Sequence, residues 1–300
     1  MQLTPEQRVQ FAEEGYLLLR GALDDSDLDP VIAEYEAHIA HRAEQFMAAG
    51  TITDLHADKP FDRRLVEICR ENDAIYENLD IMHFRGRASF EFLHNEHLLD
   101  IVEGLVGPEI TCSPVQHTRA KLPAGLTPSG GDPHLAPWHQ DAGAYREEAD
   151  PHDVLTVWLP LSPARPENGC MQIIPRMHRA GLIEHYIQQG LVTIDVDEDS
   201  AEQEPLALPM DRGDLLLMHK SMPHRSTPNN TDTVRWSMDL RYQQTGTPSG
   251  RPYFPDFVVR SRSHPDTPMR DYDEWCRLWI EALKEIKGKA IKGHRWAVVK

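Results

Sequence analysis

The chain has 300 residues, of which 40% are hydrophobic and 26% charged, and its formal net charge is −17. This composition predicts a globular protein with a sizeable core, and the acidic balance argues against a nucleic-acid partner, whose phosphates bind clustered Lys and Arg. The first residues lack the basic start and apolar core of a signal peptide, and no apolar run reaches the roughly 18 to 20 residues of a membrane span. We therefore expect a cytoplasmic protein with no membrane partner; its 4 cysteines form no C-x-x-C and are expected to be reduced. Composition does not indicate the oligomeric state.

The first hundred residues are predicted to be mostly helical. Thr4 and Pro5 form an N-cap and a first-turn proline, and the apolar residues that follow recur at helical spacing as far as Glu14. Similar spacing predicts three more helices, the last of which closes at Gly107-Pro108 in a helix stop pattern. The elements predicted for this part are helices over 5–14, 25–45, 62–72 and 91–106 and a strand over 16–19.

From Glu109 onward the chain consists of short runs rich in Val, Ile, Thr and Leu, separated by Pro, Gly and Asn. This pattern is typical of an antiparallel β sandwich or barrel. Two long connections, 123–137 and 176–190, interrupt it, and structureless stretches of this length tend to be lids or disordered. An amphipathic helix over 271–287 ends the chain. The predicted strands are 110–121, 137–145, 153–162, 170–175, 191–196, 206–208, 214–219, 223–227 and 233–244.

A candidate metal site begins in the run Trp138 to Tyr145, where His139 and Asp141 stand two residues apart. On an extended chain, side chains at i and i+2 leave from the same face, so these two can converge on one ion. The best third ligand is His224, which lies 83 residues after Asp141 and follows a buried-looking run. Two imidazoles and one carboxylate leave coordination positions open, as a non-haem Fe(II) oxygenase requires.

Other histidines compete for the third position. The chain has 16 His and 48 acidic residues, so an isolated H-x-D pair is expected by chance and its value depends on its surroundings. His134 and His152 lie in polar loops, and His219 lies just upstream of the better candidate. Gln140 points away from the two ligands on a strand, which suits a supporting hydrogen bond or a substrate contact equally.

Further short motifs accompany these residues over most of the chain: Phe11–Tyr16, Trp138–Asp141, Thr156–Leu161, Glu167–Met171, Pro175–Arg179, Gly213-Asp214 and Pro223–Ser226 with Arg235. In their order and spacing they resemble the phytanoyl-CoA dioxygenase family of Fe(II)- and 2-oxoglutarate-dependent oxygenases. The resemblance implies a mainly β fold with flanking helices around a double-stranded β-helix (jelly-roll, cupin-like) core. We expect one domain over 1–300, with a helical part at 1–108, the jelly-roll core at 109–260 and a C-terminal helix in 261–300.

The resemblance also implies roles for individual residues. His139, Asp141 and His224 would be the iron ligands, and Arg235 with Ser226 would hold the far carboxylate of 2-oxoglutarate. A planar, permanently charged guanidinium suits that carboxylate. If 223–227 and 233–244 pair as a hairpin, Arg235 comes close to Ser226.

Two softer assignments follow from the same resemblance. Trp158 and His117 fall where members of the family line the co-substrate pocket. An inward-facing strand Trp is equally well explained by core packing. Asn168-Gly169 is expected to be a turn without a chemical role.

The activity implied is hydroxylation of an unactivated C–H bond of a small-molecule metabolite, using Fe(II), dioxygen and 2-oxoglutarate, with release of succinate and carbon dioxide and with ascorbate as a stimulant. Asp141 is present, which favours hydroxylation over halogenation. From position alone, Tyr145, Arg119 and the two long connections are candidate substrate contacts. One alternative is a non-oxidative metal protein of the same fold, which would not require Arg235 and Ser226. The other is a catalytically silent binding module, which would be expected to lack one of the three metal-ligating residues.

Overall fold

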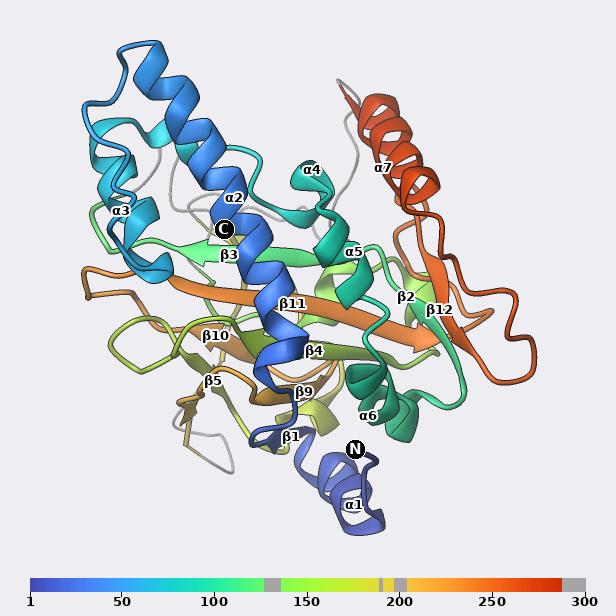
Figure 1. The fold of residues 1–300 in the computed structure, drawn as a ribbon. Helices are drawn as coiled ribbons and strands as arrows, with labels where there is room; N and C mark the ends of the chain where they lie inside the picture. Colours follow the sequence, from blue (N-terminus) through green and yellow to red (C-terminus); the bar gives the residue numbers. More distant parts are fainter. Residues whose placement is uncertain (127–135, 189–190, 197–203, 288–300) are drawn as a thin grey trace.

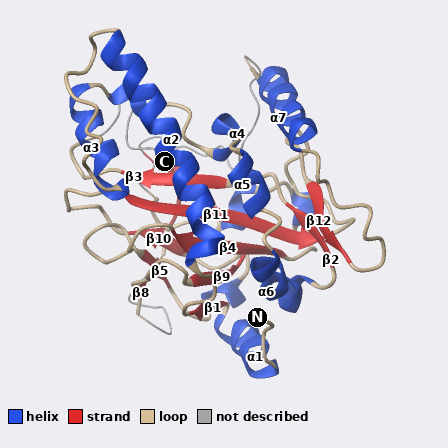
Figure 2. Cartoon of the chain, viewed as in Figure 1, coloured by secondary structure: helices blue, strands red, loops and turns tan. Residues whose placement is uncertain are grey.

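The computed structural model describes residues 1–126, 136–188, 191–196 and 204–287, and a large antiparallel sheet lies at its centre (Figure 1). A smaller antiparallel sheet faces it, and Figure 2 shows both sheets with the helices around them. The large sheet has the order β1 (Tyr16–Leu19), β9 (Leu215–His219), β4 (Val154–Pro160), β11 (Arg235–Gln244), β2 (Glu109–Cys112), β12 (Phe257–Ser261), and β3 (His117–Lys121) also pairs with β11. The small sheet has the order β10 (His224–Ser226), β5 (Met171–Ile173), β8 (Leu206–Leu208), and β6 (His185–Gln188) pairs with β7 (Leu191–Ile194).

Helices cover the outer face of the large sheet. The α-helices are α1 (Pro5–Glu14), α2 (Asp25–Ala48), α3 (Phe61–Glu71), α4 (Ile81–Phe84), α5 (Arg87–Phe92), α6 (Glu96–Val106) and α7 (Tyr272–Ile286). In Figure 1, α2 crosses in front of β11 and β4. The main hydrophobic core lies between these layers, where the Trp236 ring stacks on Phe61 with centroids 4.7 Å apart. The inner face of the large sheet is therefore left for the site.

The structure confirms most of the predicted elements. α1 begins at a capping box between Thr4 and Gln7 and ends at Gly15, whose φ of 78° is a left-handed conformation that glycine adopts readily. The strands predicted over 16–19, 153–162, 206–208, 214–219 and 233–244 are confirmed to within three residues at each end. Among the helices that the structure describes, none is long and apolar enough to cross a membrane.

Several predicted boundaries are wrong. The helix predicted over 91–106 begins at Glu96, because Asn95 caps a new helix there, and the strand predicted over 110–121 is divided into β2 and β3. The stretch predicted as a strand over 137–145 forms only a single bridge at His139 before a 3-10 turn over Asp141–Ala144. The connection 176–190, expected to be structureless, contains β6, and most of the connection 123–137 lies outside the described residues.

The predicted hairpin between 223–227 and 233–244 does not form. β10 pairs with β5 in the small sheet, whereas β11 pairs with β2, β3 and β4 in the large one. The two strands therefore face each other across the interior. Sequence proximity suggested a hairpin, but the eight residues between them, 227–234, connect one sheet to the other.

Candidate active site

The three predicted metal ligands come together in the interior. One donor atom each from His139, Asp141 and His224 lies within 4.8 Å of the others. The two histidines form an isolated antiparallel bridge, in which His139 N donates to His224 O at 3.0 Å and His224 N donates to His139 O at 2.9 Å. This backbone pairing places the imidazole centroids 4.2 Å apart. Gln140 between the ligands is extended, with φ −119° and ψ 138°, so His139 and Asp141 share a face although the strand ends there.

Both imidazole rings are oriented for metal binding by main-chain carbonyls. The Nδ1 of His139 donates to Pro137 O at 2.8 Å, and the Nδ1 of His224 donates to Met222 O at 2.9 Å. With the proton on Nδ1, the lone pair of each Nε2 is available as a ligand. Burial and the neighbouring His224 lower the pKa of His139 to about 3, so its ring is neutral near pH 7. Two imidazoles and a carboxylate suit a divalent transition metal with coordination positions left open.

The carboxylate of Asp141 is held by a second buried charge, Arg241. Arg241 Nε donates to Asp141 Oδ2 at 2.9 Å and Nη2 donates to Oδ1 at 2.6 Å, and the Thr156 hydroxyl also donates to Oδ2. Burial alone would raise the pKa of Asp141, but the Arg241 guanidinium and His224 hold it well below its usual value. Arg241 also pairs with Asp239. Arg241 was not predicted as a site residue, although the alternation of polar and apolar residues along 235–244 places it on the same face as Arg235.

Arg235, the predicted co-substrate anchor, is buried on the inner face of β11. Its Nη1 donates to Ser237 Oγ, and its guanidinium carbon lies 5.3 Å from the centroid of the Trp158 ring. No carboxylate pairs with it in the described part of the chain, and its Nε finds no acceptor there. Burial and the nearby Arg119 lower the pKa of Arg235 to about 10, so it stays charged near pH 7. Such a group can bind an anionic ligand.

Lys121 lies between Arg235 and Ser226 in the interior. It lies opposite Arg235 in the register of β3 and β11, it is 1% exposed, and its Nζ donates to Ser226 Oγ at 2.8 Å. Ser226 and Arg235 therefore lie on either side of Lys121, in different sheets. Lys121 was not predicted as a site residue. The sequence predicted one strand over 110–121, and the separate strand β3, on which residues 117, 119 and 121 share the inner face, was not recognised.

The two softer candidates both lie on the inner face of the large sheet. Trp158 is buried on β4, where it packs in a hydrophobic cluster and also lies beside Arg235. His117 shares the inner face of β3, but its Nδ1 is 2.7 Å from Asp80 Oδ2. This hydrogen-bonding contact orients the ring.

Two other positions have structural roles. The amide of Gln140 donates to the backbone of Gly181 and Ser221 and accepts from Ile183 N, at 2.7 to 2.8 Å, so it fastens the segment before β6 to the site. This explains its orientation without a substrate contact. Asn168-Gly169 is a turn, as predicted, with Gly169 at φ 101°.

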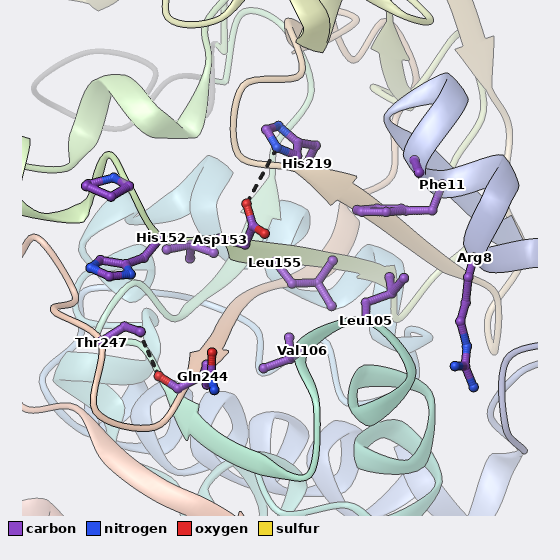
Figure 3. A pocket seen from close by; sticks show the side chains of 13 residues that line it. Arg8, Phe11, Leu105, Val106, His152, Asp153, Leu155, His219, Gln244 and Thr247 are labelled. Carbon is purple, nitrogen blue, oxygen red and sulfur yellow. Dashed lines mark hydrogen bonds and ion pairs between the residues drawn. The ribbon is translucent and has the colours of Figure 1, made fainter.

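The competing histidines do not join the triad. His134 lies outside the described residues. His152 and His219 line a separate pocket of about 490 Å³ between α1, α6 and the start of β4, in which Phe11 also takes part (Figure 3). There the Nε2 of His219 is 3.9 Å from Asp153 Oδ1. The prediction that His224 is the better third ligand agrees with this placement.

Comparisons with known proteins agree with this geometry. A profile of the family described as phytanoyl-CoA dioxygenase (PhyH) matches residues 11–237. The 1-deoxypentalenic acid 11-beta-hydroxylase of Streptomyces exfoliatus is 27% identical over 252 residues, which are 80% of this chain and 81% of the relative.

Two solved structures share the fold. The apo non-haem monooxygenase ThoJ aligns over 94% of this chain and 96% of its own, with a TM-score of 0.63 and 19% identity. The epimerase SnoN, in complex with Fe3+, alpha ketoglutarate and nogalamycin RO, aligns over 83% and 87%, with a TM-score of 0.54 and 17% identity. The predicted jelly-roll core with flanking helices is thereby confirmed.

Proposed function

The chain belongs to the phytanoyl-CoA dioxygenase (PhyH) family, and we propose that it is an Fe(II)- and 2-oxoglutarate-dependent dioxygenase that hydroxylates an unactivated C–H bond of a small-molecule metabolite. In this reaction one oxygen atom of O2 enters the substrate as hydroxyl, and the other enters succinate as 2-oxoglutarate loses carbon dioxide. The observation that carries the proposal is the buried cluster of two cations, Arg235 and Lys121, with the hydroxyl of Ser226, which is two residues from the ligand His224. A metal protein without an anionic co-substrate has no need of this cluster.

The donor set supports Fe(II) as the metal. His139 and His224 would bind it through Nε2, and Asp141 through an oxygen, most directly Oδ1, which lies 4.0 Å from His224 Nε2. When bound, the metal supplies the activation of dioxygen. The presence of a carboxylate ligand favours hydroxylation over halogenation. The hydroxylase relative from Streptomyces supports hydroxylation, and the SnoN complex, which contains Fe3+ and alpha ketoglutarate, supports the metal and the co-substrate.

The chain's own residues bind and orient the reactants. Arg235 offers a guanidinium to the far carboxylate of 2-oxoglutarate, and Lys121 and Ser226 offer further donors to it. Trp158 forms an apolar wall beside this carboxylate. Arg241 and Thr156 hold Asp141 in one orientation, so the ligand geometry is set before the metal binds.

The test is succinate formation from 2-oxoglutarate under air with Fe(II) and ascorbate. Wild type is compared with His139→Ala, Arg235→Met and, as a matched control, Arg277→Met on the exposed surface of α7. We expect loss of turnover in the first two variants and normal turnover in the control. If correctly folded, Fe(II)-loaded wild type neither binds nor consumes 2-oxoglutarate, the non-oxidative metal protein becomes the better account.

A further inference from the structure

Arg119 lies at the centre of the inner face of β3. His117 and Lys121 flank it on the same face, and in the pairing of β3 with β11 it stands opposite Ser237, one inward position away from Arg235. Thr118 and Ala120 between them are buried on the opposite face. Arg119 itself is half-buried, whereas Lys121 beside it is buried.

No acidic side chain in the described part of the chain pairs with Arg119. Arg119 does act on the carboxylate of Asp80: burial would raise the pKa of Asp80, but His117 and Arg119 hold it below its usual value. The two oxygens of Asp80 are already bonded to other groups: Oδ2 to His117 at 2.7 Å, and Oδ1 to Ile81 N at 2.8 Å and Thr118 N at 3.1 Å. Among the described residues, Arg119 therefore has a carboxylate in its electrostatic range but none in direct ion-pair contact.

The other cations on the inner faces of β3 and β11 already have partners or assigned roles. Arg241 is shared by Asp141 and Asp239. Arg235 and Lys121 form the pocket that we assign to the far carboxylate of 2-oxoglutarate. Arg119 is the remaining cation of β3 and β11 without an assigned role. Its positive charge lies close enough to Arg235 to lower the pKa of that guanidinium. A second anion bound at Arg119 would relieve this repulsion, because a guanidinium forms paired hydrogen bonds with carboxylate and phosphonate oxygens.

We propose that Arg119 forms a second anion subsite, which binds a carboxylate or phosphonate group of the primary substrate. This inference rests on the proposed function, because it assigns the neighbouring cations to 2-oxoglutarate. It names the substrate class as an anionic small metabolite, oriented by its acid group so that another of its carbons lies at the metal. Neutral analogues that lack the acid group are rejected, since Arg119 would then remain without an anion.

The first test uses wild type loaded with Ni(II) and 2-oxoglutarate, so that no turnover occurs. Phenylglyoxal modifies accessible arginines, and peptide mass spectrometry follows the rate at Arg119 and, as a control, at the exposed Arg270. The probes are hexanoate, hexylphosphonate and hexanamide. A probe at about nine times its Kd should slow modification of Arg119 roughly tenfold. We expect this from one or both acids, not from the amide, with no change at Arg270.

Several outcomes would overturn the inference. Equal protection by hexanamide would show that the site does not select an anion, and no protection by any probe would show that it does not bind one. If 2-oxoglutarate alone protects Arg119 fully and the acids add nothing, Arg119 belongs to the co-substrate subsite, and this inference fails while the proposed function stands. If 2-oxoglutarate does not bind the metal-loaded protein at all, the proposed function fails, and this inference with it.

Two variants separate the subsites in a second measurement. In calorimetric titrations of the same loaded protein with the protecting acid, Arg119→Met should weaken binding of the acid about tenfold or more, the effect of losing one hydrogen bond to a charged group. Arg119→Lys should recover part of it. The affinity for 2-oxoglutarate should stay within twofold in both. An unchanged affinity of Arg119→Met for the acid would contradict the proposal.

Discussion

The two faces of β11 differ in almost every physical respect. On the outer face Trp236, Met238, Leu240 and Tyr242 are each 0% exposed and pack against the helices. On the inner face Arg235, Ser237, Asp239, Arg241 and Gln243 alternate with them and carry two cations and one anion. Successive side chains of a strand leave from opposite faces, so one ten-residue segment serves two purposes. The outer face stabilises the fold by apolar burial, and the inner face holds charges for ligands.

Breaking the ion pair of the inner face should have the largest effect. Arg241→Met leaves the buried Asp141 and the partly buried Asp239 without their cation, so we expect the free energy of unfolding to fall by about 3 to 5 kcal/mol, together with loss of metal binding. Urea unfolding and Co(II) titration measure the two effects. The double variant Arg241→Met/Asp239→Asn should recover part of the stability. Unchanged stability in the single variant would show that the pair is not the main support of Asp141.

A cavity on the outer face should affect stability alone. Met238→Ala removes a fully buried side chain from the core, and we expect a loss of about 2 to 5 kcal/mol in urea unfolding. At temperatures where the variant remains folded, its affinity for 2-oxoglutarate should match that of wild type. Partial unfolding of the variant would lower the apparent affinity to a calculable extent. A greater loss of affinity would mean that the two faces are not independent.

Removing Arg235 from the inner face should have the opposite pattern. Arg235→Met removes a buried charge that has no carboxylate partner among the described residues, so stability should be unchanged or higher. Binding of 2-oxoglutarate should weaken by about 2 kcal/mol or more, which is roughly thirtyfold. Calorimetry on the Ni(II)-loaded protein measures the affinity, and Arg235→Lys serves as the conservative control. An affinity unchanged in Arg235→Met would remove Arg235 from the co-substrate pocket.

A smaller effect is expected at Lys121. Lys121→Met should weaken 2-oxoglutarate binding by about 1.5 kcal/mol, or roughly tenfold, because a hydrogen bond from a charged donor is lost. The same titration measures it. If the affinity changes as much in Lys121→Met as in Arg235→Met, the two cations act as one unit, and their separate assignments need revision.

The smallest effect concerns the orientation of His117. The pKa of Asp80 is lowered in the folded state, so its contribution to stability is present above the unfolded pKa of about 3.9 and is lost as the pH falls below that value. Asp80→Asn should therefore lower stability by about 1 kcal/mol at pH 7 and flatten the acid limb of the stability curve. Urea unfolding between pH 7 and pH 3 checks this; an unchanged acid limb would show that the His117 pair contributes nothing to stability.

Local patterns were sufficient for much of the fold. The capping box at Thr4, the apolar spacing of α2 and α7 and the alternation in 235–244 are all short-range signals, and each predicted its element correctly. The strand predicted over 137–145 was wrong because one bridge to His224, not a full ladder, holds this segment. That bridge joins residues 85 positions apart, and no local pattern reports such a contact.

The sequence by itself determined which residues are chemically able to form the site: the H-x-D pair, a later histidine and a strand arginine, because metal binding and anion binding depend on residue type. The tertiary structure decided their partners. Lys121 lies beside Ser226, Arg241 holds Asp141, and Arg119 forms no ion pair within the described residues, because strands far apart in the chain face one interior. Charge pairing depends on distances between side chains, and long-range strand pairing sets those distances.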